Sequence, residues 1–482
     1  MAQVECIGHI LIFPFPAQGH VNSMLKLAHL LDLANFHITF FVPSNIHARL
    51  LALTDVDSGR FSPRFRLQSF PPGIYDGGID SKEGALELYQ SLHTIAKPFL
   101  KQYIAHNRDS GLPFTCFISD LVLSIALEVS EQCFNLPVYY FRTIGACAFW
   151  ALFSLPDLFE AGELPIKENG MESPITKVKG MEDFLRARDL PSWCRYEEDD
   201  TGRIVYTETR RAVEARALIL NTLEDLEGPI LSQIRTKCPK VYTIGPLHAR
   251  LKATLSSKST HSNSLWQEDE TCMGWLDSQE PKSVIYVSFG SISVLTRQQL
   301  MEFWYGLVNS GKKFLWVMRS DLVAGKDEET PIPSELEEGT KANGYIIGWA
   351  PQEAVLDHPA VGGFLTHSGW NSTLESIAAG VPMICWPFFA DQQTNSRFVG
   401  EVWKLGLDMK DVCDRSSVEK LIRELMEKRK GEFLERAENM VKLAKEAISE
   451  GGSSYCNFDC LIQDIIKLNE SMSEEDTVKC AG

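Results

Sequence analysis

The sequence has few of the features that mark a membrane or nucleic-acid-binding protein. No apolar run approaches the roughly 20 residues that a membrane-spanning helix needs, and no basic segment precedes the first apolar stretch at residues 10–15. Basic residues are in deficit, with a net charge of −17, which argues against nucleic acid or an anionic membrane as a partner. We therefore expect a cytoplasmic protein in which any anionic ligand is held by a local group of donors.

Three further patterns are absent, and each absence disfavours one kind of chemistry. The twelve cysteines are scattered, and Cys456 and Cys460 have no Cys or His partners at zinc-finger spacing, so we expect mostly buried, reduced thiols. No Gly-x-Gly-x-x-Gly follows a predicted strand, which disfavours an NAD-dependent dehydrogenase. No Asp-x-Asp pair stands at a predicted strand end, where it could hold a divalent metal ion.

The first half of the chain alternates apolar, strand-like runs with amphipathic, helix-like segments. The pattern predicts strands at residues 8–15 and 37–42 around a helix at 21–34, and the alternation repeats between residues 114 and 141. Strands that alternate with helices form parallel sheets. We therefore predict an open parallel α/β sheet.

The second half restarts this pattern after a linker region predicted at about residues 247–266, which is rich in Ser, Thr, Lys and His. The predicted elements are strands at 283–289, 313–318, 345–348, 363–366 and 382–386 and helices at 296–309, 352–356 and 368–379. We therefore predict two doubly wound α/β domains in tandem, at residues 1–246 and 247–456, with a helix at about 457–482 that packs back on the first. Because open α/β sheets bind ligands at the carboxyl ends of their strands, we expect the active site in an interdomain cleft.

The most informative segment runs from Trp349 to Gln392. It begins with WAPQ, contains HSGWNSTLE at residues 367–375 and ends with Asp391-Gln392. This segment of 44 residues resembles the signature box of plant secondary-product UDP-glycosyltransferases. With the N-terminal loop and the strand–helix pattern, the resemblance covers essentially the whole chain. It implies a GT-B fold of two Rossmann-like domains and transfer of a sugar from a UDP-sugar.

Physical reasoning also predicts an anion site in the middle of this box. The segment lies where a predicted strand turns into a helix, so free backbone N–H groups and the positive end of the helix dipole face a ligand above the sheet. His367, Asn371 and Ser372 can donate hydrogen bonds to phosphate oxygens, and Gly369 permits close approach of the backbone. Ser368 or Asn371 could instead only cap the helix, because capping uses the same groups.

By resemblance, other residues of the box hold the nucleoside and the sugar. Within the box, Trp370 together with the final glutamine is the pattern that the family uses for glucose. Outside the box, Ser291 is a further candidate for the phosphate and Thr143 is a further candidate for the donor site. The resemblance assigns Trp349 and Ala350 to the uracil, Gln352 and Glu375 to the ribose, and Asp391 and Gln392 to the sugar hydroxyls.

His20 is the candidate catalytic base. It lies in the loop PAQGH at residues 16–20, between the first predicted strand and helix. A lone His at a helix start is usually structural, but the resemblance assigns the base to this loop and its carboxylate partner to Asp120, at the end of another predicted strand. His20 would take a proton from the acceptor while the acceptor oxygen attacks the anomeric carbon from the face opposite UDP, which inverts the configuration. The resemblance implies neither a metal ion nor a covalent intermediate.

The sequence does not specify the acceptor. Residues 75–89, 144–155 and 184–196 are rich in aromatic and aliphatic side chains, so we expect them to line an apolar pocket. Residues 20–27 and 141–143 resemble the family branch that acts on iridoids and related terpenoids. We therefore expect a monomeric enzyme that transfers glucose from UDP-glucose to a hydroxyl, or a carboxyl, of a small terpenoid or phenolic acceptor. The alternative is a catalytically silent nucleotide-sugar-binding protein, which an assay of UDP release would distinguish.

Overall fold

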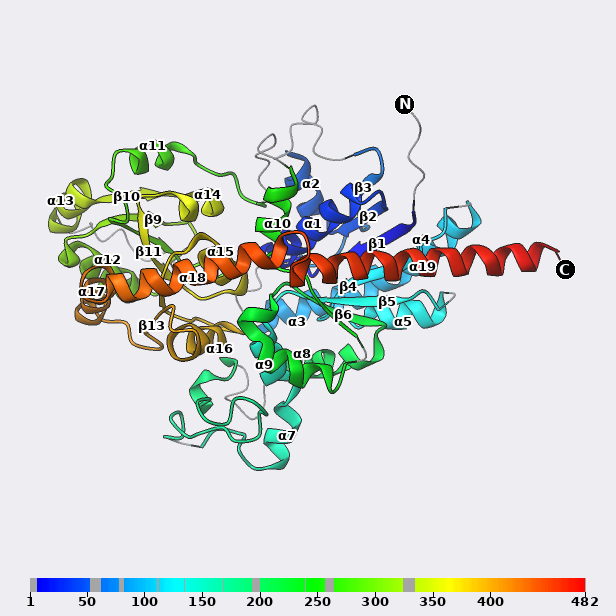
Figure 1. Ribbon diagram of the computed structural model, residues 1–482, viewed down its shortest axis with the longest axis horizontal. Coiled ribbons are helices and arrows are strands. Elements are labelled where there is room, and N and C mark those ends of the chain that lie inside the picture. The colour runs from blue at the N-terminus through cyan, green and yellow to red at the C-terminus, as the bar shows by residue number, and fades with distance from the viewer. Residues whose placement is uncertain are drawn as a thin grey trace. The chain divides into compact units, whose positions relative to one another are not determined.

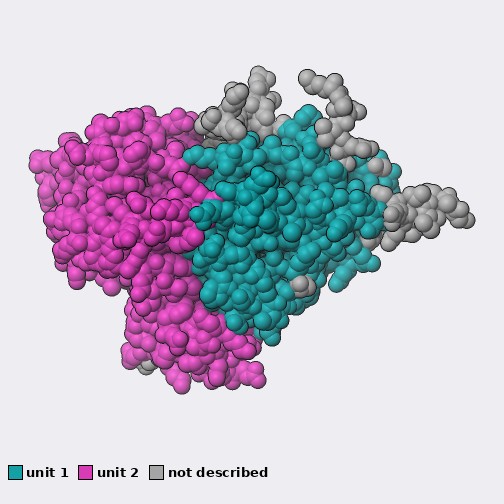
Figure 2. Space-filling model, in the orientation of Figure 1, with its two compact units in different colours: residues 1–155, 198–265, 446–482 teal, residues 156–197, 266–445 magenta. Residues whose placement is uncertain are grey.

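The computed structural model describes residues 7–52, 62–77, 82–110, 112–133, 135–167, 169–192, 200–238, 240–255, 264–323 and 334–481. The chain divides into two compact units, shown in teal and magenta in Figure 2. Unit 1 comprises residues 1–155, 198–265 and 446–482, and unit 2 comprises residues 156–197 and 266–445.

Unit 1 is built on a parallel sheet. Within the described residues, this sheet has seven strands in the order β3-β2-β1-β4-β5-β6-β7 (Figure 1). The strands are β1 (His9–Phe13), β2 (His37–Val42), β3 (Phe65–Ser69), β4 (Cys116–Asp120), β5 (Val138–Arg142), β6 (Ala217–Leu220) and β7 (Val241–Thr243). Each pair of neighbours is parallel, and β1, β4, β5 and β6 are buried along their whole length, as expected for strands covered on both faces.

Helices connect the strands of unit 1. They are α1 (Gln18–Leu33), α2 (Ser44–Ala52), α3 (Lys82–Ser91), α4 (Lys97–Asp109), α5 (Ile125–Gln132), α6 (Ala146–Phe153), α8 (Asp200–Arg210), α9 (Glu224–Arg235), α10 (Leu247–Leu255) and α19 (Ser453–Ala481). The last of these, α19, is drawn in red in Figure 1 and packs against the sheet edge at β7, where Asn457 donates a hydrogen bond to Thr243 at 2.7 Å. The C-terminal helix thus belongs to the same compact unit as the first strands of the chain.

Unit 2 repeats this architecture. Its sheet has, within the described residues, six parallel strands in the order β10-β9-β8-β11-β12-β13. The strands are β8 (Val284–Ser288), β9 (Lys313–Val317), β10 (Gly344–Ile347), β11 (Val361–Thr366), β12 (Met383–Cys385) and β13 (Gly406–Asp408). The helices are α7 (Leu155–Glu160), which begins at the boundary between the units, α11 (Thr271–Asp277), α12 (Arg297–Ser310), α13 (Ser334–Asn343), α14 (Gln352–Asp357), α15 (Trp370–Ala379), α16 (Gln392–Arg397), α17 (Arg415–Arg423) and α18 (Lys430–Ile448). The predicted pair of doubly wound α/β domains is confirmed.

The bounds of the units differ from the predicted domain bounds at three places. Residues 446–456, predicted in the second domain, belong to unit 1. Residues 156–197, predicted in the first domain, belong to unit 2. Residues 247–255, predicted as the start of the linker, form helix α10, which packs against α1 in unit 1. The greater part of the remaining predicted linker, residues 256–263, lies outside the described residues.

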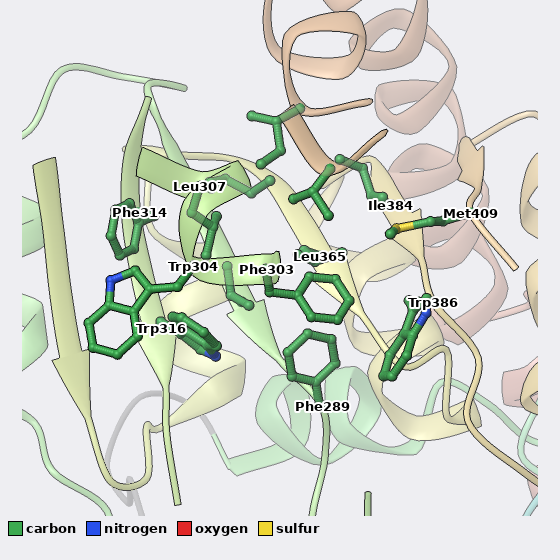
Figure 3. Close-up of a cluster of buried hydrophobic side chains, with 14 of the residues drawn as sticks. Phe289, Phe303, Trp304, Leu307, Phe314, Trp316, Leu365, Ile384, Trp386 and Met409 are labelled. Atoms are coloured by element: carbon green, nitrogen blue, oxygen red, sulfur yellow. The ribbon is translucent and has the colours of Figure 1, made fainter. Parts of the chain in front are cut away.

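A cluster of aromatic side chains forms much of the core of unit 2 (Figure 3). The ring of Trp386 meets Phe289 at 5.5 Å and Phe303 at 4.9 Å, in both cases edge to face. Full burial of a side chain such as Phe stabilises a fold by about 1.5–3 kcal/mol. Because Phe289 follows β8 and Trp386 follows β12, this cluster supports the two loops that continue toward Ser291 and Asp391.

None of the described helices is both long enough and apolar enough to cross a membrane.

Candidate functional site

The structure brings His20 and Asp120 together in unit 1. His20 lies in the first turn of α1, and Asp120 is the last residue of β4; β1, which precedes α1, pairs directly with β4. The imidazole Nδ1 of His20 lies 2.6 Å from the carboxylate Oδ2 of Asp120. The Asp120 side chain is fully buried, whereas the His20 side chain is 24% exposed. With the Nδ1 proton donated to the carboxylate, Nε2 carries the lone pair that can accept a proton from a substrate.

Neighbouring groups hold this pair in place. Asp120 accepts hydrogen bonds from the backbone N–H groups of Phe15 and Val122, each at 3.3 Å. The ring of Phe15 also packs against the imidazole, at 5.2 Å between centroids. The hydroxyl oxygen of Thr143 lies 3.0 Å from Nδ1 of His20, so it is a second acceptor for the same proton. Thr143, expected at the donor site, is thus placed beside His20.

The other predicted site residues lie in unit 2, where β11 turns into α15. Ser368 adopts a φ of +64°, and Gly369 is the N-cap of α15. Because glycine has no side chain with which to cap, no side chain at the N-cap satisfies the first backbone N–H groups of this helix of ten residues. These N–H groups and the helix dipole could hold an anion, so this turn is the candidate anion site that the sequence predicts.

Two glycines make room for the imidazole of His367. A Cβ atom at Gly369 would lie 2.6 Å from Nε2 of His367, and a Cβ at Gly290, in the loop after β8, would lie 2.4 Å from the same nitrogen. Real Cβ atoms do not approach nitrogen so closely. Gly290 also has a φ of +74°, which disfavours other residues. Nε2 of His367 therefore lies close to both Gly290 and Gly369, where the absence of a side chain leaves room for the ring.

Burial and the nearby positive charge of Arg319 lower the pKa of His367 to about 4. The ring is therefore neutral at pH 7 and donates a hydrogen bond from one nitrogen. Two buried hydroxyls have no hydrogen-bond partner within the described part of the chain: Ser293 Oγ, in the loop after β8, and Thr373 Oγ1, in the first turn of α15. Because buried polar groups are almost always hydrogen-bonded, these two hydroxyls are available to a polar ligand.

Arg319, just beyond β9, is a site residue that the sequence reasoning missed. Its buried guanidinium donates hydrogen bonds to the backbone carbonyl of Gly290 and, at 3.0 Å, to that of Ser293. Its charge is paired with Asp321 at 2.8 Å. Arg319 thus fixes the loop that carries the half-buried Ser291 and adds positive charge near the anion site. An arginine that directly follows the apolar run of residues 314–318 was the only signal in the sequence.

Gln352 and Glu375, predicted for the ribose, form a hydrogen-bonded group with Ser372, predicted for the phosphate. The amide nitrogen of Gln352 donates to Ser372 at 2.9 Å and to the carboxylate of Glu375 at 2.7 Å. The half-buried Trp349 stacks on Trp266 at 5.4 Å between centroids. Of the remaining predicted residues here, Ala350 and Trp370 are buried, and Asn371 is half-buried in the first turn of α15.

Asp391 and Gln392 lie at the start of the short helix α16. The side-chain oxygen of Gln392 accepts hydrogen bonds from the backbone N–H groups of Phe388 and Phe389 at 2.7 and 3.0 Å, so its amide nitrogen is the atom that can donate to a ligand. Asp391 accepts a hydrogen bond from Asn395 at 2.7 Å, and the same Asn395 amide donates to the backbone carbonyl of Ser368 at 2.9 Å. This amide links the start of α16 to the anion site.

The predicted acceptor segments are divided between the units. Residues 144–155 lie in unit 1 and include α6, which is buried along its whole length. The buried carboxylate of Glu227 accepts hydrogen bonds from the first backbone N–H groups of this helix at 2.9 and 2.7 Å. Residues 75–77 and 82–89 also lie in unit 1, but residues 184–192 belong to unit 2; residues 78–81 and 193–196 lie outside the described residues.

Within the described ranges, no group of three His, Cys, Asp or Glu side chains is placed to hold a metal ion.

Comparisons with known proteins show what this chain is similar to. Residues 258–444 match the family model for UDP-glucoronosyl and UDP-glucosyl transferases. The chain is 56% identical to 7-deoxyloganetic acid glucosyltransferase of Catharanthus roseus, over 95% of this chain and 97% of that protein. It is 43% identical to myricetin 3-O-rhamnoside 1,2-glucosyltransferase of Crocosmia x crocosmiiflora, over 97% and 98%. Among solved structures, Os79 from O. sativa in complex with UDP matches with a TM-score of 0.78 and 28% identity, over 96% of this chain and 99% of that one.

Proposed function

Since this chain belongs to the UDP-glycosyltransferase family, we propose that it transfers glucose from UDP-glucose to a hydroxyl group of a small iridoid acceptor, with inversion and without a metal ion. The enzyme is a glycosyltransferase with a UDP-sugar donor and a small-molecule acceptor. The single observation that carries the proposed chemistry is the distance of 2.6 Å between Nδ1 of His20 and the buried Asp120 carboxylate.

The proposed reaction is one displacement at the anomeric carbon. As the acceptor oxygen forms its bond to this carbon from the face opposite UDP, Nε2 of His20 takes the hydroxyl proton. The bond between the anomeric carbon and the β-phosphate oxygen breaks, and UDP leaves with the electron pair. Asp120 stabilises the imidazolium that forms and holds the ring in the required tautomer. General base catalysis of this kind contributes about 10²- to 10⁴-fold in rate.

The proposed donor site is assembled from unit 2. The start of α15, together with His367 and the half-buried Ser291, would stabilise the charge that develops on the leaving diphosphate, as fixed dipoles do in other enzymes. Trp349 would stack on the uracil, and the pair of Asp391 and Gln392 would hold the glucose hydroxyls. The amide nitrogen of Gln392 supports this last role, because the oxygen of the same side chain is already engaged by backbone groups.

Similarity to the Catharanthus protein supports an iridoid acceptor. That protein is named for an acid, so the acceptor can offer a carboxyl as well as a hydroxyl. An alcohol must lose a proton as it attacks, whereas a carboxylic acid with a pKa near 4 is already ionised at pH 7. The size of the activity loss in a His20 variant therefore distinguishes transfer to a hydroxyl from transfer to a carboxyl.

We also propose a monomer that works in the cytoplasm. All nine cysteines whose side chains are described are free thiols, which is usual in a reducing compartment. Size-exclusion chromatography with light scattering would test the monomer, and localisation of a fluorescent fusion would test the compartment.

The proposed function is tested by the turnover of UDP-glucose with 7-deoxyloganetic acid and related acceptors in His20→Ala and Asp120→Asn. We expect His20→Ala to lower kcat by about 10² or more with little change in UDP affinity, and Asp120→Asn to lower it less, because the ring remains. His106→Ala, at an exposed position on α4, is the matched control and should be fully active.

Near-wild-type kcat of His20→Ala with an alcohol acceptor would remove His20 from the catalytic role. A small loss together with an alkali-labile product would instead identify a glucose ester, and would overturn the proposed transfer to a hydroxyl.

A further inference from the structure

A buried carboxylate links residues 156–197 to the helix that begins at Gln392. Asp189 ends the short 3₁₀ turn Ala187–Asp189, and its side chain is fully buried. Its oxygens lie 2.9 Å from Arg186, 2.9 Å from Lys410 and 3.5 Å from Arg397. Since Arg397 is the last residue of α16 and Lys410 follows β13, one carboxylate joins three parts of unit 2.

The same turn also contacts α16 through its backbone. The buried hydroxyl of Thr394 donates a hydrogen bond to the carbonyl of Asp189 at 2.8 Å. The guanidinium of Arg397 donates to the carbonyl of Phe184 at 3.0 and 2.9 Å, and Lys410 donates to the carbonyl of Gln393 at 2.7 Å. Three of the six residues of α16 are thus held by the turn or by the lysine that pairs with it.

These contacts decide where α16 lies. A helix of six residues has little stability alone, because isolated helices shorter than about 12 residues are marginal in water, so its position comes from tertiary contacts. Asn395 of this helix joins Asp391 to the carbonyl of Ser368 at the candidate anion site. The Asp189 turn holds Thr394 and Arg397 of the same helix. A shift of this turn would therefore move Asp391 and Gln392 relative to the phosphate-binding residues.

We propose that Asp189 is a positioning residue for the sugar end of the donor site: it holds α16 so that Asp391 and Gln392 meet the glucose hydroxyls. This inference rests on the proposed function, which assigns these two residues to the sugar. UDP without its sugar makes none of these contacts. Loss of the Asp189 charge should therefore weaken recognition of the sugar and leave the affinity for UDP nearly unchanged.

The test uses Asp189→Asn. This substitution preserves the size of the side chain, and the backbone carbonyl that accepts the hydrogen bond from Thr394 remains. We expect the KM for UDP-glucose to rise about 10-fold and the preference for UDP-glucose over UDP-galactose to fall, while the Kd for UDP, measured by calorimetry, stays within about 2-fold. Asp411→Ala is the matched control, because it removes another carboxylate that pairs with this segment: Asp411 is exposed and contacts Arg188 at 2.6 Å. The control should show wild-type kinetics.

Each outcome separates the inference from its alternatives. An equal loss of affinity for UDP and UDP-glucose would mean that Asp189 only stabilises the fold, and unchanged kinetics would mean that α16 does not depend on it; either result overturns the inference. If Asp189→Asn fails to fold, Thr394→Val, which removes one neutral hydrogen bond, must show the same selective rise in KM. Wild-type protein that transferred no glucose would refute the proposed function itself, whereas an active wild type beside an unaltered Asp189→Asn would refute this inference alone.

Discussion

Replacing Gly369 by alanine should displace His367 without straining the backbone. Gly369 has φ −60° and ψ 146°, a conformation that any residue adopts. An added Cβ would nevertheless lie 2.6 Å from Nε2 of His367, whereas ordinary contacts begin at 3.4 Å. The imidazole must therefore move by most of an ångström, and the backbone of Gly290 restricts its movement on the other side.

The expected loss follows from one hydrogen bond to a charged ligand. Hydrogen bonds to charged groups contribute about 1.5–3 kcal/mol. If the displaced ring no longer reaches the phosphate, Gly369→Ala should bind UDP about 10- to 100-fold more weakly. Gly290→Ala should lose at least as much, and it should also be less stable by about 1–2 kcal/mol, because alanine is strained in the left-handed region.

Isothermal titration calorimetry with UDP measures this loss, and thermal unfolding measures stability. Gly311→Ala is the matched control for backbone strain, because Gly311 has a φ of +68° and no atom lies within 4 Å of the added Cβ. This control should unfold at a lower temperature and bind UDP as the wild type does. Wild-type affinity in Gly369→Ala would refute the assignment of His367 to the phosphate, and weak binding in Gly311→Ala would mean that UDP affinity reports only on general stability.

Three further predictions concern the base, the metal and the pH dependence. Thr143→Val removes the second acceptor for the Nδ1 proton and should lower kcat less than His20→Ala does; an equal loss in the two variants would contradict a supporting role for Thr143. EDTA should leave turnover unchanged, and activity lost on chelation and restored by Mg²⁺ would contradict the metal-free mechanism. Burial lowers the pKa of His9 to about 4, so between pH 6.5 and 4 the unfolded chain binds a proton that the folded protein does not, and stability falls as the pH falls. From pH 7 to pH 5 the free energy of unfolding should fall by about 2 kcal/mol through this group. The urea midpoint of His9→Gln should therefore shift less over this range than that of the wild type. An equal shift in the two proteins would refute the lowered pKa of His9.

Much of the candidate site could be predicted from sequence because its residues follow predicted strands. Parallel strands end at the same edge of a sheet, so His20 and Asp120 were expected at one edge although 100 positions separate them. Direct pairing of β1 with β4 then brings them into contact. The box from Trp349 to Gln392 was equally predictable, because its two strand–turn–helix transitions are local and its motifs are specific.

Contacts between polar loops could not be predicted in this way. The contact of Thr143 with His20 was not predicted; it arises because β5 lies next to β4, and this neighbour relation places the Thr143 hydroxyl against the imidazole. The alternation of apolar and polar residues indicates which positions are buried; it does not indicate which carbonyl a buried arginine such as Arg319 will meet. The role of Arg319 depends on loops from two strands at once.

The sequence by itself determined the alternation of strands and helices, the turn from β11 into α15 and the family, because each depends on residues that are close along the chain. Only the tertiary structure decided that residues 156–197 belong to unit 2, and that Asp189 meets Lys410 and α16. The physical reason is that a buried carboxylate must find cations, and besides the neighbouring Arg186 these are Arg397 and Lys410, more than 200 residues away, whose approach no local pattern of the sequence records.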